Sequence, residues 1–532
     1  MHYFFDHTSS SPRPHRRPLR LVPALAALML SGCMVGPDFQ VPDAPAASGY
    51  TAKGLQPTQS TKGVPGGGTQ NFALGQDVSA DWWTLFGSKQ LNAFVEEAVR
   101  NHPSVEAAEY ALRSARETAL STDGNLYPQV SLSDTSTRAR NAASGGAPPN
   151  IYNLYNASVG VSYGLDLFGG ARRQSEAKYA AADYQRYQLE ATYLSLTANV
   201  VNAAITEASL RAQINATESI VKLQQDQLER IQKQFELGAV PNSDVLSQQS
   251  NLAQTQASLP TLQKQLAQQR NALMAYLGRL PSQDRGESID LSQLRLPKSL
   301  PVSLPSDLVR QRPDIKAAEA TLHQASASVG VSVASMLPQV SLSGQYGGSS
   351  ASLSHLLSPD SIAWSIAASV TQKLIDGGSA FHSKEASVAT YEQNLANYKS
   401  TVITAFQNVA DSLRAIEFDA KALQAQSAAE RSAKASLDMA RDQYKTGAVV
   451  YATVLNALQT YQNAVISRVK AQATRYTDTV ALYQSLGGGW WNRNDETDRS
   501  KPRVNPGYFA GPTPQSQPAD KSNEQNKKDS RS

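Results

Sequence analysis

The chain contains two long segments of nearly equal length that lack both proline and glycine. One covers residues 171–237 and the other covers residues 379–446. Both are rich in Ala, Gln, Leu, Glu and Arg, which are strong helix formers. At about 1.5 Å per residue, each run predicts a helix on the order of 100 Å long. Such a helix does not belong to an ordinary globular core and indicates coiled-coil packing.

The two runs belong to a tandem duplication. The sequence LYPQVSL at residues 126–132 recurs as MLPQVSL at residues 336–342. The other landmarks recur in the same order: His102-Pro103 and Arg312-Pro313, Gly169-Gly170 and Gly377-Gly378, the GAV sequences from Gly238 and from Gly447, and YLG ending at Gly278 with SLG ending at Gly487. We therefore expect two structural repeats, at residues 96–280 and 306–488.

Each repeat contains two strand-like segments between its first helical stretch and its long run. In the first repeat, apolar residues occupy the odd positions from Val159 to Leu167; in the second, they occupy the even positions from Ile362 to Leu374. This alternation predicts strands with one apolar face and one small or polar face. A soluble half-buried sheet alternates in the same way, but a length of about 9–11 residues suits a tilted membrane strand. Four such strands cannot close a barrel, so several chains would have to combine theirs.

The N-terminus has the pattern of a secretory signal peptide. Four arginines within residues 1–20 precede an apolar stretch from Leu21 to Leu30, and Leu30-Ser31-Gly32 leads directly into Cys33. This resembles the lipobox of bacterial lipoproteins, which implies cleavage after residue 32 and acylation of Cys33, including palmitate. A buried cysteine after an ordinary signal peptide is the alternative. Several acyl chains anchor a protein stably to a bilayer.

Composition excludes several classes of function. The 532 residues carry a net charge of only +4, which argues against a nucleic-acid-binding protein. One cysteine excludes a disulfide framework, and the chain contains no Gly-Lys dipeptide, no GxSxG and no HExxH. The seven histidines are scattered. We therefore predict no catalytic site, no cofactor and no metal, and we do not expect an enzyme.

These features together resemble the TolC-like family of outer-membrane factors, in its lipoprotein (NodT-type) branch of tripartite efflux systems. The resemblance rests on the lipobox followed by Val35-Gly36-Pro37-Asp38-Phe39, the duplication, LYPQVSL, the DLFGG and LIDGG junctions and the two GAV sequences, and it covers about residues 33–490. It implies an α+β membrane protein and a homotrimer. Four strands per chain would form a 12-stranded outer-membrane β-barrel, continued by a long periplasmic α-helical barrel.

The resemblance also assigns the remaining segments. Residues 33–95 would be the lipidated N-terminal segment and the start of an equatorial layer, and residues 281–305 an equatorial connector. The strand loops at Arg138–Tyr152 and Tyr346–Ser361 would face the cell exterior. The C-terminal tail, residues 489–532, is rich in proline and charge, and we expect it to be disordered.

The candidate functional positions follow the two glycines that end the long runs, because apolar stepping on both sides predicts antiparallel helical hairpins there. In the family these tips meet a periplasmic adaptor and close the tube. The adaptor-contact candidates are Gly238, Ala239, Val240, Pro241, Gly447, Ala448 and Val449. The periplasmic gate candidates are Asp244, Ala452, Thr453 and Asn456.

The gate of this chain departs from the family pattern. In the family, aspartates six and nine positions after each tip glycine form rings around the threefold axis. Asp244 matches one such position, but Thr453 and Asn456 replace the acids of the second repeat, and Ala452 replaces a frequent leucine. This predicts a looser or hydrogen-bonded closure. Favourable placement of Asp244 at a helix N-terminus is an equally strong alternative.

The resemblance implies a passive outer-membrane channel that exports small molecules such as drugs or toxic compounds. Its partners would be a periplasmic adaptor (membrane fusion) protein, an inner-membrane efflux pump of the RND type, and outer-membrane lipid through acylated Cys33. Two alternatives remain: the exit duct of a type I protein or peptide secretion system, and a lipid-anchored periplasmic coiled-coil scaffold without a pore. In the scaffold, Tyr163 and Trp364 would be core residues.

Overall fold

The computed structural model describes residues 34–47, 49–142 and 148–493. Its helices and strands, in chain order, are β1 (Asn71–Leu74), α2 (Lys89–Asn101), α3 (Pro103–Asp123), β2 (Gln129–Asn141), β3 (Asn150–Leu165), α4 (Gly170–Glu236), α5 (Asn242–Tyr276), β4 (Ser299–Val302), α6 (Pro305–Gln311), α7 (Pro313–Ser335), β5 (Gln339–Ser350), β6 (Ile362–Thr371), α8 (Ser379–Lys445) and α9 (Tyr451–Ser485).

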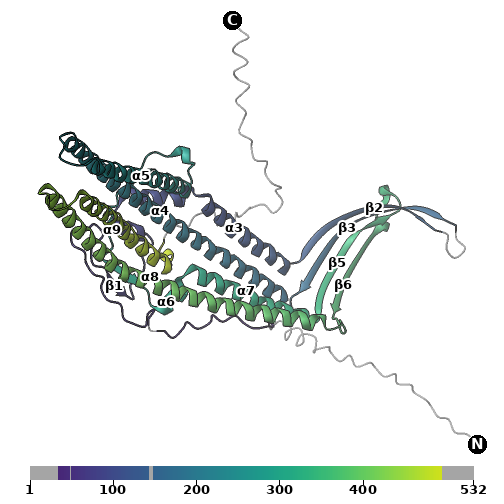
Figure 1. Ribbon diagram of the computed structural model, residues 1–532. Helices are drawn as coiled ribbons and strands as arrows, with labels where there is room; N and C mark the ends of the chain where they lie inside the picture. Colours follow the sequence, from purple (N-terminus) through teal and green to yellow (C-terminus); the bar gives the residue numbers. More distant parts are fainter. Residues whose placement is uncertain (1–33, 48, 143–147, 494–532) are drawn as a thin grey trace, which may run out of the picture.

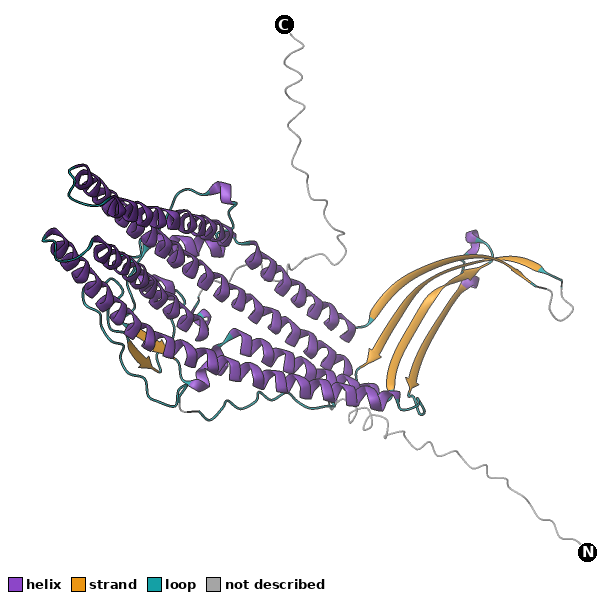
Figure 2. Ribbon diagram, in the orientation of Figure 1, coloured by secondary structure: helices purple, strands orange, loops and turns teal. Residues whose placement is uncertain are grey.

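The molecule is elongated, with helices side by side at one end and a curved sheet at the other (Figures 1 and 2). Across the helical part the order is α3, α4, α7, α8, and each helix packs against the next. The helices α5 and α9 return beside α4 and α8. The sheet continues from the helical end at which α3 and α7 stop and α4 and α8 start.

The two predicted long helices are confirmed. Both α4 and α8 have 67 residues, and each begins after a glycine in the left-handed region, Gly169 with φ 78° and Gly378 with φ 85°. An aspartate precedes each glycine and accepts backbone N–H groups of the first turn. Asp166 accepts from Ala171 at 2.9 Å, and Asp376 accepts from Ala380 at 2.9 Å. These carboxylates satisfy donors that a helix start leaves unpaired, which explains the two Asp-containing junctions.

The four long strands form one antiparallel sheet in the order β2-β3-β5-β6. Its two faces differ. One cross-strand row consists of Leu132, Val159, Tyr346 and Trp364, whereas the adjacent row on the other face consists of Ser131, Gly160, Gln345 and Ser365. The apolar face lies open: Leu132 is 80% exposed and Trp364 is 71% exposed. Within one chain, β2 and β6 have a free edge each.

Two predicted boundaries need correction. The predicted loops at Arg138–Tyr152 and Tyr346–Ser361 are partly strand, because β2 and β3 have 13 and 16 residues and β5 has 12, longer than the expected 9–11. The polar residues at the strand ends misled the prediction, since backbone pairing does not depend on side-chain polarity. The tail predicted to begin at residue 489 also starts with ordered structure: Trp490–Asn492 form a 3-10 turn. Residues 494–532 lie outside the described residues.

The largest apolar core lies around the middle of the long helices. Trp82 stacks on Tyr483, with ring centroids 5.3 Å apart, and Phe86 packs against Tyr476. The parallel pair β1–β4 joins the N-terminal segment to the connector between the repeats. The segments expected to form an equatorial layer therefore share one core. Among the described residues, no helix is both long and apolar enough to cross a membrane.

Candidate functional site at the hairpin tips

Each long helix ends in a turn that reverses the chain into a shorter helix. Residues 237–241 connect α4 to α5, and residues 446–450 connect α8 to α9. Gly238 has φ 72° and Gly447 has φ 77°, in the left-handed region that disfavours side chains. In both turns the residue after the glycine donates its N–H to a carbonyl of the last helical turn, at 2.8 and 2.9 Å. The two predicted hairpins are therefore present, and glycine is required at both turns.

The surface of the tips is small and open to solvent. The exposed adaptor-contact candidates are Gly238, Ala239, Pro241, Gly447 and Ala448. The two valines, Val240 and Val449, are half-buried. Val240 packs against the tip cluster, a group of buried residues that includes Ile231, Val245, Tyr451 and Val454. The first tip thus packs on the buried tip cluster through Val240, while small exposed residues form the ends of both tips.

Three of the four gate candidates share one exposed helix face. Ala452, Thr453 and Asn456 lie in the first turns of α9, and all three are exposed in the single chain. The opposite face of α9 carries Tyr451 and Leu458, which are 2% exposed and belong to the tip cluster. The three positions named by the resemblance thus share a common surface, and none of them is charged.

Asp244 lies elsewhere, in the first turn of α5, and is half-buried. Burial and, after it, the charge of Asp244 raise the pKa of Tyr444 on α8, so Asp244 lies within electrostatic range of the second hairpin. The residue at the helix start is Pro241, which has no side-chain cap. The carboxylate is still placed favourably for the helix dipole. Asp244 therefore lies on α5, whereas the other three gate candidates lie on α9.

A buried hydrogen-bond chain joins the two hairpins, and the sequence did not reveal it. The Tyr451 hydroxyl donates to Gln248 Oε1 at 2.7 Å, and Gln248 Nε2 donates to the Gln224 carbonyl at 2.7 Å. Burial raises the pKa of Tyr451 far above its ordinary value, so the hydroxyl keeps its proton. Gln224 was visible as a polar residue in an apolar stripe, but only its backbone carbonyl takes part in this chain, and its side-chain Oε1 and Nε2 are buried without a hydrogen-bond partner among the described residues. The bonding partners Gln248 and Tyr451 lie on α5 and α9, which no local pattern identifies.

A second buried polar group lies where the N-terminal segment crosses α8 and α9. Arg475 is fully buried and donates to the carbonyls of Gly66 and Gly68 at 2.7 and 2.8 Å. Nearby, the carboxyl of Asp419 on α8 faces that of Asp478 on α9. Burial and the contact with Asp478 raise the pKa of Asp419 to about 8. Asp419 Oδ2 is buried and accepts no hydrogen bond from the described residues, so a shared proton between the carboxyls supplies the missing donor.

Cys33 lies outside the described residues, but the segment that follows it is firmly held. Val35 donates its N–H to the Phe168 carbonyl at 3.1 Å, next to the sheet–helix junction. Arg173, with a side chain only 1% exposed, pairs with Asp38 at 2.6 Å and with Glu176 at 2.8 Å. Phe39 stacks on His323 with ring centroids 4.4 Å apart. The chain after the predicted lipobox therefore starts at the base of the sheet.

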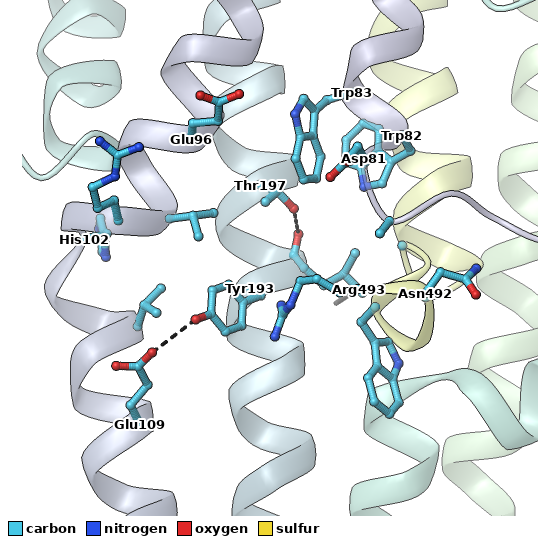
Figure 3. Close-up of a pocket in the computed structure, with 18 of the residues that line it drawn as sticks. Asp81, Trp82, Trp83, Glu96, His102, Glu109, Tyr193, Thr197, Asn492 and Arg493 are labelled. Atoms are coloured by element: carbon cyan, nitrogen blue, oxygen red, sulfur yellow. Dashed lines mark hydrogen bonds between the residues drawn. The ribbon is translucent and has the colours of Figure 1, made fainter. Parts of the chain in front are cut away.

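A cavity with a volume of about 1030 Å³ lies beside the apolar core at the middle of the helices. Figure 3 shows it between α2, α3, α4 and the last described residues. Glu109 accepts a hydrogen bond from Tyr193 at 3.2 Å, and Arg493 lies 4.0 Å from the Tyr193 ring centroid. His102 Nδ1 accepts the backbone N–H of Ser104 and caps α3. The contact between His102 and Ser104 at the cavity wall is therefore explained by capping of α3. Among the described residues, no group of three or more His, Cys, Asp or Glu side chains is arranged to hold a metal ion.

Comparisons with known proteins agree with this geometry. A sequence profile described as "Outer membrane efflux protein" matches residues 94–279 and 304–488, once in each repeat. The antibiotic efflux pump outer membrane protein ArpC of Pseudomonas putida is 28% identical over 483 residues, which cover 90% of this chain and 96% of ArpC. The cation efflux system protein CusC of Escherichia coli is 27% identical over 488 residues, covering 89% and 100%.

Solved structures share the fold. The outer-membrane channel OprN superposes with a TM-score of 0.78 at 27% identity, covering 86% of this chain and 100% of that one. The open state of the Neisseria gonorrhoeae MtrE outer membrane channel has a TM-score of 0.73 at 25% identity, covering 87% and 100%.

Proposed function

The chain belongs to the outer membrane efflux protein family, and from this premise we propose that three copies assemble into the channel of a tripartite efflux system. It is an outer-membrane efflux protein with a large periplasmic portion. The trimer, its 12-stranded barrel, its partners and its cargo are the parts that we propose.

The observation that carries the proposal is the two-faced sheet with its free edges. Trp364 and Ile366 on β6 are 71% and 81% exposed, and no helix covers this face. In water such a face would be unfavourable, whereas in a bilayer it would contact lipid. A membrane does not tolerate unpaired strand edges, so β6 of one copy has to pair with β2 of the next. Three copies would close a barrel of twelve strands, with the Ser- and Gly-rich face lining the channel.

The same exposure argues against the coiled-coil scaffold. In that alternative Trp364 would be a core residue, but it is among the most exposed aromatic residues of the chain. No described feature favours the exit duct of a protein secretion system. The relatives reported above are named for efflux of antibiotics and of cations. We propose small toxic compounds or drugs as cargo, with the choice among them made by the pump.

The proposed partners follow from the two ends of the molecule. The exposed small residues of both tips suit close packing of an adaptor protein, whose contact would connect the channel to an inner-membrane pump of the RND type. The chain itself conducts passively. At the other end, the held segment after residue 33 would place acylated Cys33 beside the sheet, where its lipid enters the outer membrane.

Negative-stain electron microscopy of the detergent-extracted mature protein tests the assembly. We expect threefold particles with a tube on the order of 100 Å, the length of a 67-residue helix. Slender monomers or twofold rods would contradict the channel. Dye accumulation in a strain that lacks the gene, with and without the plasmid-borne gene, tests transport. Restored export supports the proposal, and unchanged accumulation despite an intact trimer contradicts it.

A further inference from the structure

The four long strands carry few charged residues, and all of them lie on one side of the sheet. The strands β2, β3, β5 and β6 contain one acid, Asp134, and two bases, Arg138 and Arg140, all on β2. The register is uninterrupted, so the even positions of β2 share one face with Leu132 and Trp364, here called the outward face. In these strands the opposite face, which would line the channel, carries no charged residue.

The apolar part of the outward face has the height of a membrane band. On β3, every outward residue from Leu165 to Tyr155 is apolar or aromatic. At about 3.4 Å per residue this run is about 34 Å long, and a strand tilt of about 40° reduces its height to about 26 Å. Outer-membrane barrels have an apolar band about 25 Å tall. The run ends in Tyr155, an aromatic residue of the kind that lies at membrane–water interfaces.

The two arginines follow directly beyond this band. Tyr155 is paired with Ser136, and Asn153 is paired with Arg138. Arg138 and Arg140 therefore lie about 7 and 14 Å past the band along the strand, or about 5 and 10 Å in height. The headgroup layer of a leaflet is about 5–8 Å thick, and the long side chain of arginine extends its reach. Because β2 leads away from the helices (Figure 1), this layer belongs to the outer leaflet.

The positive charge of the pair is not compensated within the described part of the chain. Arg138 and Arg140 are exposed and form no salt bridge with another described residue. Asp134 lies four residues before Arg138, about 14 Å along the strand, which is too far for an ion pair. The two arginines are about 7 Å apart on one face. Each guanidinium can bind a phosphate with two parallel hydrogen bonds, and the amide of Asn153 adds a neutral donor beside Arg138.

We propose that Arg138 and Arg140 bind the phosphate groups of a lipid in the outer leaflet of the outer membrane. The proposal rests on the barrel proposed above and adds a ligand to its outward face. A glycolipid with two phosphates on its sugar head suits the site better than a lipid with one, because each guanidinium then takes its own phosphate.

Neither transport nor closure of the barrel explains these two charges. The arginines do not lie on the face that would line the channel. Pairing of β2 with the next copy would use the backbone edge of the strand and leave its outward face open. Hydration of the strand end is served by uncharged residues such as Thr135, Thr137 and Asn141. A cation on the outward face gains from an anion at headgroup height, whereas deeper in the band it would be costly.

Addition of defined lipids to the detergent-extracted protein tests the site. The probe is diphosphoryl lipid A, and the readout is the midpoint of thermal unfolding, since a ligand that binds the folded state raises it. We expect a rise of several degrees for the wild type, about half of it with monophosphoryl lipid A and none with the phosphate-free glycolipid. Arg138→Gln with Arg140→Gln should lose most of the rise. Arg138→Lys with Arg140→Lys should keep part of it, because the charge remains and the paired hydrogen bonds do not.

The matched control removes the same charge far from the sheet. Arg230 and Lys233 are an exposed pair near the end of α4 that is distant from the strands. Arg230→Gln with Lys233→Gln should respond to the lipid as the wild type does. An equal loss of the response in both glutamine double variants, or a full response in both, would overturn the site.

Measurements without added lipid separate the site from a contact between copies. The Arg138→Gln, Arg140→Gln variant should then unfold at the wild-type temperature and still form threefold particles. Asp360 lies directly before β6, the strand that β2 of the next copy would meet. If the arginine variant and Asp360→Asn both lower the midpoint without lipid by the same amount, the arginines pair with this acid and the lipid site is wrong.

The remaining outcomes separate the site from the proposed function. If the wild type forms threefold particles but its midpoint does not respond to phosphorylated lipid, the site is wrong and the channel stands. If the wild type forms no threefold particles, the site and the channel both fall. A response that depends on phosphate and on both arginines, in threefold particles, establishes the site.

Discussion

Replacing Asp419 with asparagine should remove much of the pH dependence of this protein's stability. The folded chain holds the carboxyls of Asp419 and Asp478 together, and the pKa of Asp419 rises from 3.8 to about 8 because of burial and the neighbouring acid. Between these values the folded state keeps a proton that the unfolded chain has released. Stability therefore falls as pH rises from about 4 to about 8 and is constant above that. An asparagine amide would donate to Asp478 at every pH.

The size of the effect follows from the same shift. Roughly four pKa units at about 1.4 kcal/mol each set an upper limit on the order of 6 kcal/mol. Asp419 is only half-buried, so solvent screens the effect, and we expect on the order of 2 kcal/mol between pH 5 and pH 8. At roughly 2–4 °C per kcal/mol for a large domain, this is about 5 °C in the midpoint of thermal unfolding.

The assay is the midpoint of thermal unfolding of the detergent-extracted protein, followed by tryptophan fluorescence. One heating rate is used throughout, because many large proteins unfold irreversibly. The advantage of Asp419→Asn over wild type should be small at pH 5 and largest at pH 8. Asp411→Asn, an exposed position on the same helix, should follow wild type throughout. If the thermal midpoints of wild type and Asp419→Asn change with pH in parallel, Asp419 does not keep its proton in the folded state and the reasoning is wrong.

Three further variants test the tips and the anchor. Gly447→Trp forces a side chain onto a backbone at φ 77° and onto the proposed adaptor surface, so dye export should be lost while electron microscopy still shows trimers; unchanged export would exclude this tip as an adaptor contact. Tyr451→Phe removes the hydrogen bond to Gln248, which weakens the contact between the two hairpins by about 1 kcal/mol and should raise channel conductance in planar bilayers. Tyr444→Phe is its control, because the Tyr444 hydroxyl is buried without a hydrogen bond from the described residues; equal conductance changes in both variants would contradict the role of the bond. Cys33→Ser should abolish incorporation of labelled palmitate, and label retained on the variant would exclude Cys33 as the acylated residue.

Much of the fold could be predicted because its determinants are local. The absence of proline and glycine throughout both long runs set the length of α4 and α8, and the aspartates and glycines before them set where they begin. Gly238 and Gly447 marked the reversals because few other residues adopt a positive φ. Alternation identified the two-faced strands. The ends of the strands were less predictable, because the polar residues there are as common in loops as in solvent-exposed strands.

The candidate site was predicted only in part. The family resemblance named Ala452, Thr453 and Asn456, and the structure places them together on one exposed face of α9, while their role as a gate stays a prediction. It could not show that Asp244 lies within electrostatic range of Tyr444, because that depends on how the two hairpins pack together. The cavity beside Tyr193 and the ordered turn from Trp490 were missed for the same reason: their walls come from segments far apart in the chain.

The sequence by itself thus determined the repeat, the helices, the turns and the two unlike faces of the strands, since each depends on neighbours a few residues away. Only the tertiary structure decided that Tyr451 reaches Gln248, that Asp419 meets Asp478, and that α3 and α8 are the outer members of the row of helices. Long helices of similar composition can pack side by side in many different orders, and their local conformational free energies barely differ between these orders. The order they adopt is chosen by the fit of whole surfaces, which no short stretch of sequence contains.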